Sequence, residues 1–225
     1  MVEGIAALIP ALNEEKNIEQ VVRRTRPFVD KIVVVDDGST DKTSELAKAA
    51  GATVLQHSVN KGKGEALRTG FGYIRKQQGI RWIVIIDADL QFAPEDTPAV
   101  LAPLKEGRAD FVMGSRDWSI VPIRHKLGNW VWRTAFNVLF GTRLPDTNCG
   151  FVAMSVEAAS KLNLSGGYIV ENSMLASAVR AGLRLASASV SVNYHRRSAV
   201  PRGVRMVLGI MIFILREGLA YRLQR

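Results

Sequence analysis

The sequence predicts an α/β fold, with a mostly parallel sheet covered by helices on both faces. Two observations lead to this prediction. Short apolar runs of strand length alternate with segments of helical periodicity through the first half of the chain. Unusual polar residues stand where these runs end, at Pro10, Asp36, Asp37, Asp87 and Asp89. Because open α/β sheets bind ligands beyond the carboxyl ends of their strands, this pattern also predicts a ligand site there.

The chain has 225 residues, of which 47% are hydrophobic and 23% charged, so it can bury a full core as one large domain. Pro10 ends the first apolar run, as proline does where a strand stops. In the first half of the chain, strands are expected at 5–10, 31–35, 53–55 and 81–87.

Three helices are expected between these strands. The first opens at 13–15, with acidic residues in its first turn. The second is capped by Thr40 and runs through Ala50. The third follows the glycine-rich loop 60–64 and continues to about Gln78.

The second half is expected to contain, in order, a helix at about 95–106, a strand at 110–116, an aromatic helix at 124–140, a helix from Val170 and a strand at 183–194. Trp130 and Trp132 cannot both face the core, so one of them is expected at a surface, where it could contact a membrane. His125 on the same helix is expected at the surface. We assign residues 1–200 to one catalytic domain and 201–225 to a C-terminal amphipathic helix.

The stretch from Trp82 to Gln91 is the one around which the chain is organised. It begins as an apolar run, as a strand buried on both faces does, and it ends in carboxylates two apart. Residues two apart on an extended chain point the same way, so Asp87, Asp89 and Gln91 are expected to present three oxygen ligands at one sheet edge. Such ligands suit Mg²⁺ or Mn²⁺, which would bridge the protein to a phosphate. A strand that simply ends in a polar turn is the alternative.

The net charge of +9 predicts a polyanionic partner such as nucleic acid, nucleotide phosphates or an anionic membrane. Basic residues concentrate late in the chain: 195–225 holds seven arginines and one Glu. The single cysteine, Cys149, excludes an internal disulfide, fits a reducing compartment and is expected to be a packed small residue. The start of the chain does not resemble a signal peptide, and no apolar segment approaches the roughly 20 residues that span a bilayer.

A Rossmann dinucleotide site is disfavoured, because no G-x-G-x-x-G follows a strand, and the P-loop pattern is absent. Six other motifs occur in order: IPALNEE at 9–15, VVVDDGSTD at 33–41, NKGKGEALRTGF at 60–71, DADLQ at 87–91, GSR at 114–116 and DTNCGF at 146–151. In this order and spacing they resemble family-2 glycosyltransferases of the GT-A fold. The resemblance is closest to dolichyl-phosphate mannose synthases and related polyprenyl-phosphate glycosyltransferases, and it covers about residues 5–198.

The resemblance implies a donor site for a nucleotide sugar. Its base, ribose and diphosphate would lie against Pro10, Leu12, Glu14, Asp37, Asp87 and Ala88. Asp89 and Gln91 would hold the divalent metal on the diphosphate, and Arg116 would help to stabilise the charge of the leaving group. Asp36 can simply cap the turn that follows it, and Asp37 is the better candidate ligand of the two.

On the acceptor side the resemblance implies two carboxylates: Asp146, as a catalytic or positioning residue, and Glu171. A phosphate acceptor is already ionised at neutral pH, so it needs positive guidance more than a general base. Arg196, Arg197 and Arg202 lie in a basic loop and would bind phosphate. Relatives carry an Arg followed at a distance by Ser-Lys in this loop. This chain has no Ser-Lys there, so which arginine takes which phosphate is open.

The C-terminal segment, about 203–225, is expected to form an interfacial helix that holds the protein on a membrane. Its apolar run from Met206 to Leu215 is ten residues long, which is half a bilayer span, and arginines flank it on both sides. The side chains expected among the lipid tails are Ile210, Met211, Phe213 and Ile214. The alternatives are packing on the protein's own core, on a second subunit or on a partner membrane protein.

Together these features favour an inverting glycosyltransferase that moves a hexose from a nucleotide sugar to dolichyl or polyprenyl phosphate, peripherally on the cytoplasmic face of a membrane. GDP-mannose, UDP-glucose and UDP-N-acetylglucosamine are all open as donors, and nucleic acid is not expected as a partner. One alternative keeps this chemistry with a soluble sugar or protein hydroxyl as the acceptor. Another, from a different class, is a nucleotide-binding module without catalysis.

Overall fold

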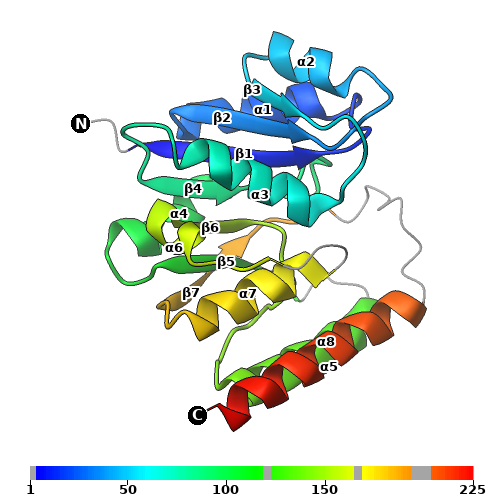
Figure 1. Ribbon diagram of the computed structural model, residues 1–225, viewed down its shortest axis with the longest axis vertical. Helices are drawn as coiled ribbons and strands as arrows, with labels where there is room; N and C mark the ends of the chain where they lie inside the picture. Colours follow the sequence, from blue (N-terminus) through cyan, green and yellow to red (C-terminus); the bar gives the residue numbers. More distant parts are fainter. Residues whose placement is uncertain (1–3, 119–122, 165–168, 194–203, 225) are drawn as a thin grey trace.

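Seven strands of the described residues form one sheet. The structure is a computed structural model that describes residues 4–118, 123–164, 169–193 and 204–224 (Figure 1). The strands are β1 (Ile5–Ala11), β2 (Lys31–Asp36), β3 (Thr53–Gln56), β4 (Trp82–Ile85), β5 (Phe111–Arg116), β6 (Val152–Ser155) and β7 (Leu185–Val190). They lie in the order β3-β2-β1-β4-β6-β5-β7, and only β6 runs antiparallel to its neighbours, β4 and β5. The predicted mostly parallel sheet is therefore confirmed.

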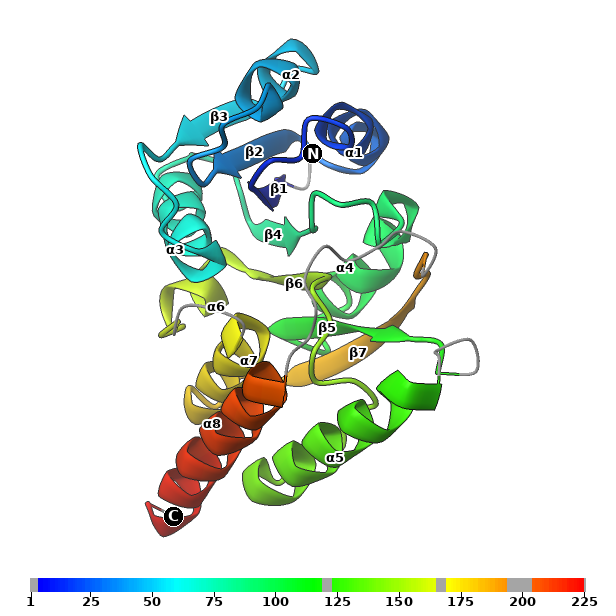
Figure 2. The same cartoon turned by 90° about the vertical axis from the view of Figure 1, so that its right-hand side faces the viewer.

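Helices cover both faces of this sheet, as predicted. The α-helices are α1 (Ile18–Thr25), α2 (Thr43–Ala49), α3 (Lys63–Ile74), α4 (Thr97–Lys105), α5 (Ile123–Phe140), α6 (Val156–Ser160), α7 (Val170–Arg180) and α8 (Val204–Leu223). Two short 3₁₀ helices are η1 (Arg26–Phe28) and η2 (Pro94–Asp96). Figure 2 shows α3, α6 and α7 on one face and α1 and α4 on the other, while α5 and α8 lie side by side at one end of the molecule.

The register of the central strands brings the ends of three strands to one edge. In the β1–β2 pair Ala11 lies opposite Asp36, and in the β1–β4 pair Leu8 lies opposite Ile85. These strands are apolar along their length and almost fully buried, because helices cover them on both sides. The polar segments that follow β1, β2 and β4 consequently begin close together.

The first helix begins later than the sequence indicates. Residues 13–17 form a turn instead of a helix, and Asn13 has a φ of 55°. The reason is a set of contacts with the loop after β2: the Asn13 amide N–H donates to Ser39 Oγ, and the Thr40 amide N–H donates to Asn13 Oδ1. The predicted cap at Thr40 is also wrong, because α2 begins at Thr43. These contacts bind the segment after β1 to the segment after β2.

The central strand is shorter than predicted, and this changes the expected metal geometry. It ends at Ile85, and the chain then turns, with Leu90 at a φ of 58°. Asp87, Asp89 and Gln91 therefore do not share an extended backbone, and the prediction that they point the same way for that reason is wrong. The turn also places Phe92 in a single β-bridge with Val192.

The C-terminal helix packs on the protein, which corrects part of the prediction. Ile210, Phe213 and Ile214 are buried against the rest of the core, and α8 contacts both α5 and α7. The Arg222 guanidinium donates to the backbone carbonyl of Leu139 on α5. These three side chains are thus not available to lipid tails. The expected domain boundary near residue 200 lies outside the described residues.

None of the helices among the described residues is long and apolar enough to cross a membrane.

Candidate active site

A cavity of about 660 Å³ opens at the carboxyl ends of β1, β2 and β4. Its walls come from the segments after these strands, from α3 and α7, and from α5 and α8. Ten of the predicted site residues line it, namely Pro10, Leu12, Glu14, Asp37, Asp87, Ala88, Asp89, Gln91, Arg116 and Glu171. Arg196, Arg197 and Arg202 lie outside the described residues. The sheet therefore collects side chains that are far apart in the chain, from Pro10 to Glu171, around one space.

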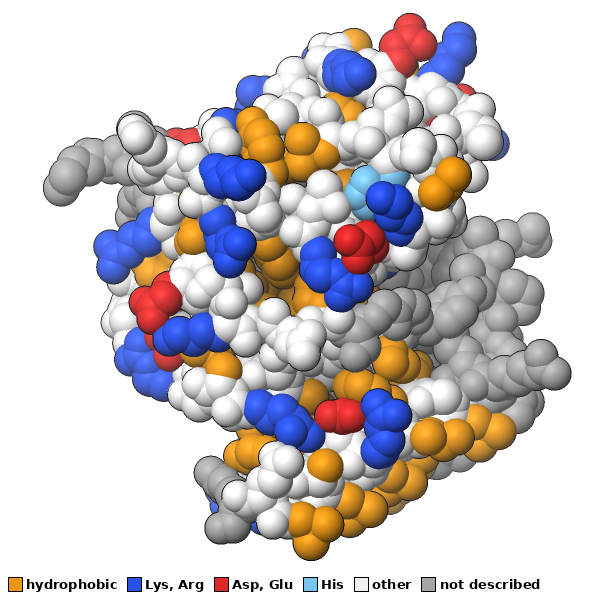
Figure 3. Space-filling view, in the orientation of Figure 1, with side chains coloured by type: hydrophobic (Ala, Val, Ile, Leu, Met, Phe, Trp, Pro, Cys, Tyr) orange, Lys and Arg blue, Asp and Glu red, His pale blue; other side chains and the backbone are white. Residues whose placement is uncertain are grey.

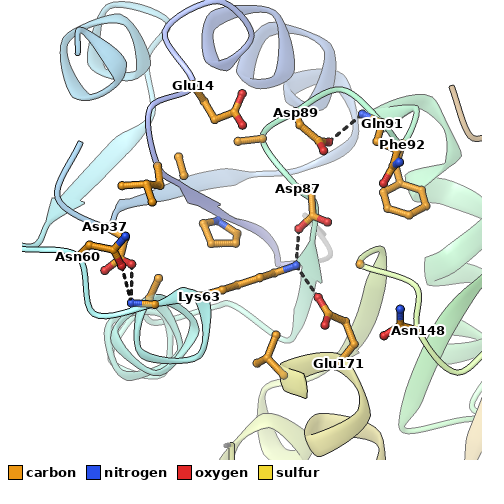
Figure 4. Close-up of a pocket in the computed structure, with 18 of the residues that line it drawn as sticks. Glu14, Asp37, Asn60, Lys63, Asp87, Asp89, Gln91, Phe92, Asn148 and Glu171 are labelled. Carbon is orange, nitrogen blue, oxygen red and sulfur yellow. Dashed lines mark hydrogen bonds and ion pairs between the residues drawn. The ribbon is translucent and has the colours of Figure 1, made fainter. Parts of the chain in front are cut away.

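Asp37 is held by donors from the loop that precedes α3 (Figure 4). The amide N–H groups of Lys61 and Gly62 donate to its two oxygens at 3.0 and 2.7 Å, and His57 Nδ1 lies 2.6 Å from Oδ1. The carboxylate is 4% exposed and lines the cavity. Its neighbour Asp36 instead accepts the Ser39 amide N–H, as a cap of its own turn. Asp37 is therefore the carboxylate of this pair that a ligand can reach.

Lys63 joins two carboxylates across the middle of the cavity. Its Nζ lies 2.6 Å from Asp87 Oδ1 and 2.7 Å from Glu171 Oε1, as Figure 4 shows. Burial lowers the pKa of Lys63, but the two carboxylates outweigh that effect and raise the pKa above its ordinary value. Lys63 is consequently a permanent cation that ties α3 to the end of β4 and to α7.

Asp87 depends on a close approach by glycine. A Cβ built on Gly150 would lie 2.1 Å from Asp87 Oδ2, a separation that no side chain could occupy. Gly150 belongs to the DTNCGF motif, and its backbone leads into β6. The motif thus contributes to the cavity through the space that its glycine leaves, as well as through its polar side chains.

Asp89 and Gln91 lie in the turn after β4. The Gln91 amide N–H donates to Asp89 Oδ1 at 2.9 Å, and the side chains of both residues line the cavity. Glu14 lies on the same side of the cavity (Figure 4), and burial raises its pKa, with the charges of Asp89, Asp41 and Asp87 adding to the effect. This side of the cavity therefore concentrates negative charge and oxygen donors.

These oxygen donors fit a hard divalent cation whose coordination shell is completed by oxygens of the substrate. No group of three or more His, Cys, Asp and Glu side chains could enclose a metal in the part of the chain that the structure describes. Mg²⁺ is commonly bound by one or two carboxylates together with substrate phosphates. Asp89 and Gln91 provide this smaller set of protein oxygens.

Arg116 and Asp146 form a buried ion pair at the other side of the cavity. Arg116 Nε lies 2.6 Å from Asp146 Oδ2, and Arg116 Nη2 lies 2.9 Å from Oδ1, so the pair is bidentate. Asp146 is 2% exposed and is not part of the cavity wall, whereas Arg116 is part of it. Asp146, which was expected to be a catalytic or positioning residue, thus orients Arg116.

The cavity also has an apolar part. Trp132 and Ile210 line it from α5 and α8, which lie side by side at one end of the molecule, and Phe92 and Val170 line it from the turn after β4 and from α7. Trp132 is 5% exposed, whereas Trp130 on the same helix is 55% exposed, as expected for two tryptophans that cannot both face the core. The side chain of His125 lies outside the described residues.

Several residues of the site were not assigned from the sequence. Lys63 and Asn60 belong to the glycine-rich loop, but nothing in the motif identifies Asp87 and Glu171 as partners of the lysine. His57 follows an edge strand and carried no signal at all. Cys149 is fully buried, as predicted, and burial raises the pKa of its thiol, so it remains protonated.

Comparison with known proteins places this chain among glycosyltransferases. The model of the family Glycosyl transferase family 2 matches residues 6–162. An uncharacterized protein of Methanocaldococcus jannaschii is 33% identical over 84% of this chain and 88% of its own length. The UDP-N-acetylglucosamine–dolichyl-phosphate N-acetylglucosaminyltransferase of Methanococcus voltae is 29% identical over 93% of both chains.

A solved structure supports the fold. Glucosyl-3-phosphoglycerate synthase of Mycobacterium tuberculosis, in complex with Mn²⁺, UDP and glucosyl-3-phosphoglycerate, is similar with a TM-score of 0.79 and 27% identity. The match covers 96% of this chain and 80% of that one. The predicted GT-A type of α/β fold is confirmed, and the alternative of a nucleotide-binding module without catalysis is set aside.

Proposed function

Because this chain belongs to glycosyl transferase family 2, we propose that it transfers a hexose, with inversion, from a nucleotide sugar to dolichyl or polyprenyl phosphate. The observation that carries the proposal is the contrast within one cavity. The side at the ends of β1, β2 and β4 holds carboxylates and, from α3, a lysine, whereas the side at β5, α5 and α8 holds Arg116 and apolar side chains. A nucleotide sugar fits the first side, and a phosphate on a long hydrocarbon chain fits the second.

The donor would lie against the segments that follow β1, β2 and β4. Asp37 can accept a hydrogen bond from the nucleoside, since an ionised carboxylate only accepts. Pro10 and Leu12 would flank the base, and Lys63 would meet the anionic diphosphate or a sugar hydroxyl. Asp89 and Gln91 would hold Mg²⁺ or Mn²⁺, which supplies charge stabilisation for the departing nucleoside diphosphate when it is bound.

The acceptor phosphate would be guided by positive charge. Arg116 is held in place by Asp146, so its guanidinium needs little reorganisation when a phosphate arrives. Arg196, Arg197 and Arg202 would add to this charge from the loop outside the described residues. Glu171, paired with Lys63, lies between the two sides, and it would contact the sugar or the acceptor.

The apolar side of the cavity adjoins a surface that suits a lipid bilayer. The outward faces of α5 and α8 expose large apolar side chains, namely Trp130, Val131, Val138, Leu208, Ile212, Leu215, Leu219 and Leu223. Figure 3 shows hydrophobic side chains in a row along this end of the molecule. Arg216 on α8 is exposed beside them. We call the exposed apolar residues of α5 and α8 the outer apolar face. We propose that this face rests on an anionic membrane on the cytoplasmic side.

The specific support for a lipid acceptor is the continuity of this arrangement. Trp132 and Ile210 line the cavity from the inner sides of the helices whose outer sides form the outer apolar face. A polyprenyl chain could therefore stay in the bilayer while its phosphate reaches Arg116. The relative from M. voltae is named for a dolichyl-phosphate acceptor, which agrees with this proposal.

A soluble acceptor is the second candidate, because the structural neighbour from M. tuberculosis is named for the transfer of glucose to phosphoglycerate. The two candidates share an anionic phosphate group near Arg116. They differ in whether the outer apolar face and the apolar side of the cavity contribute to binding the acceptor.

The test is a transfer assay with purified full-length protein, Mn²⁺ and each of GDP-mannose, UDP-glucose and UDP-N-acetylglucosamine. Each donor is offered polyprenyl phosphate in anionic vesicles, 3-phosphoglycerate, or no acceptor. We expect a glycosylated lipid with one donor and little product with 3-phosphoglycerate. Transfer to 3-phosphoglycerate at a rate equal to or above that for the lipid would contradict the lipid acceptor. No transfer or hydrolysis with any donor would contradict the function as a whole.

A further inference from the structure

His57 is a buried polar residue at an unexpected place. It directly follows β3, which is an edge strand and only partly buried, yet its own side chain is 8% exposed. Its amide N–H donates to the backbone carbonyl of Asp36 at 2.9 Å, so it extends the pairing of β2 and β3 by one residue. The imidazole thereby faces the carboxylate of Asp37, the residue that follows Asp36.

Both nitrogens of this imidazole have partners. Nδ1 lies 2.6 Å from Asp37 Oδ1, and Nε2 lies 2.9 Å from Thr69 Oγ1 on α3. Because a carboxylate only accepts, Nδ1 carries a proton and donates it to Asp37, while Nε2 shares a hydrogen bond with the Thr69 hydroxyl. The result is a chain of hydrogen bonds that joins Thr69, His57 and Asp37.

This chain leaves Asp37 with one oxygen available. Oδ1 accepts from both His57 and the Lys61 amide N–H, which satisfies it within the protein. Oδ2 accepts only the Gly62 amide N–H in the described structure, and each carboxylate oxygen can accept about two hydrogen bonds. Asp37 lines the cavity, so Oδ2 has capacity for a donor group of a ligand.

The loop that supplies the amide donors is packed against the carboxylate's own turn. A Cβ on Gly38, whose φ is 80°, would lie 2.6 Å from the carbonyl carbon of Val59. The backbone before Asp37 belongs to β2, and Gly38 after it is held by this close packing. The remaining freedom is the rotation of the carboxylate itself, and His57 is the side chain that restrains it.

We propose that His57 is a positioning residue for nucleoside recognition, which holds Asp37 so that Oδ2 faces an N–H or O–H donor of the nucleotide. The inference rests on the proposed function, since it assumes that Asp37 contacts the nucleoside. His57 itself would touch no part of the substrate. Its removal should weaken binding of the donor and of the free nucleoside diphosphate alike, because the nucleoside changes little during the reaction.

The experiment compares four variants of the full-length protein, with Mn²⁺ present throughout. His57→Asn keeps an N–H near the position of Nδ1, and His57→Gln keeps a polar group near Nε2 instead. His57→Leu removes both, and Thr69→Val removes only the hydroxyl. For each variant, the Kd of UDP and of GDP is measured by calorimetry, KM and kcat are measured for the active donor, and Tm is measured by circular dichroism.

We expect His57→Leu to raise the Kd of the preferred nucleoside diphosphate and the donor KM by about tenfold or more, as the loss of a hydrogen bond to a charged group implies, with kcat within about twofold. His57→Asn should recover most of the affinity and His57→Gln little of it, while Thr69→Val should fall between Asn and wild type. A purely structural role would lower Tm without this order of affinities.

Equal affinities for the Asn and Gln variants would overturn the proposal, as would a fall in kcat at unchanged KM for His57→Leu. If His57→Leu does not fold, the Asn and Gln variants still decide the matter. Wild-type protein that binds neither UDP nor GDP would contradict the proposed function itself. Wild-type binding that every His57 variant retains would contradict only the role of His57.

Discussion

The two sides of the cavity differ in how the protein holds their charges. On the donor side, carboxylates follow β1, β2 and β4 in turns, and each lines the cavity directly. On the acceptor side, Arg116 is the last residue of β5, and it is locked by a carboxylate that lies behind it. One side thus presents several carboxylate oxygens to a polar ligand, whereas the other presents an arginine that its partner carboxylate holds in place, near apolar side chains.

Lys63 is the element that both sides share. It reaches from α3 to Asp87 on the donor side and to Glu171 on α7. Because it pairs with Asp87 on the donor side and with Glu171 between the two sides, loss of the lysine would leave two anions close together. Substitutions on one side of the cavity should therefore have effects that can be told apart from those on the other side. The effects should range from loss of transfer to loss of membrane binding alone.

Asp89→Ala is expected to have the largest effect. It removes the carboxylate proposed to hold the metal, so transfer should fall by about a thousandfold or more, comparable to the loss of a main electrostatic stabiliser. Metal-dependent binding of the nucleoside diphosphate should be lost, and the circular dichroism spectrum should be unchanged. Turnover near that of wild type would rule out the metal assignment.

Gly150→Ala, in the DTNCGF motif, is expected to damage the donor side of the cavity. The new methyl group must displace Asp87, whose Oδ2 lies 2.1 Å from the position of the added Cβ. We expect kcat/KM to fall by about a hundredfold, as misplacement of a site by about 1 Å does. Gly72→Ala on α3 is the matched control, because an added Cβ there meets nothing within 4 Å. Equal kcat/KM values for the two variants would show that a steric clash with Asp87 does not impair the reaction.

Arg116→Lys tests the acceptor side. Lysine keeps the charge but cannot make the bidentate contact with Asp146, so the buried carboxylate loses one of its two charged hydrogen bonds. The free energy of unfolding should fall by about 1–3 kcal/mol, measured by urea denaturation. The acceptor KM should rise more than the donor KM. An equal rise in both values would show that the arginine does not distinguish the two sides.

Asp37→Asn tests the nucleoside end alone. An amide oxygen remains, but the charge is lost, and the amide NH₂ opposes one of the protein's own donors. We expect the donor KM to rise by about tenfold while kcat stays within about threefold, because the lost contact is uniform binding. Steady-state kinetics at saturating acceptor measures both. A lowered kcat with unchanged KM would place Asp37 in the chemical step instead.

The outer apolar face should have the smallest effect on the chemistry and a specific effect on location. Ile212→Glu combined with Leu219→Glu places charges on two exposed positions of α8. Binding to anionic liposomes in a flotation assay should be lost, while nucleoside diphosphate affinity should be unchanged. Glu45→Gln on α2, far from this face, is the control. Unchanged flotation of the double variant would show that another surface contacts the membrane.

Deletion of residues after Pro201 is not a suitable test of membrane binding. Ile210, Phe213 and Ile214 belong to the protein core, so the deletion would expose apolar surface and create new association by itself. The paired glutamates leave this inner side of α8 intact.

The sequence by itself predicted six of the seven strands that the structure describes, the mostly parallel character of their sheet and the edge at which the cavity opens. Apolar runs must be buried, and polar residues at the ends of parallel strands must meet at one edge, so both conclusions follow from local pattern. The motifs identified Asp37, Asp89, Arg116 and Asp146 as site residues. Their assignment as ligands of particular groups stays a prediction.

Only the tertiary structure decided which partners these residues take. The Lys63–Glu171 contact joins positions 108 residues apart, and no local pattern encodes it. The same holds for the contact of His57 with Asp37, for the pairing of Arg116 with Asp146, and for the two faces of α8. An apolar helix has several sides, and composition cannot tell which one packs on α5 and α7 and which one remains exposed. That choice depends on the shape of the whole fold, because burial is shared among elements that are distant in the chain.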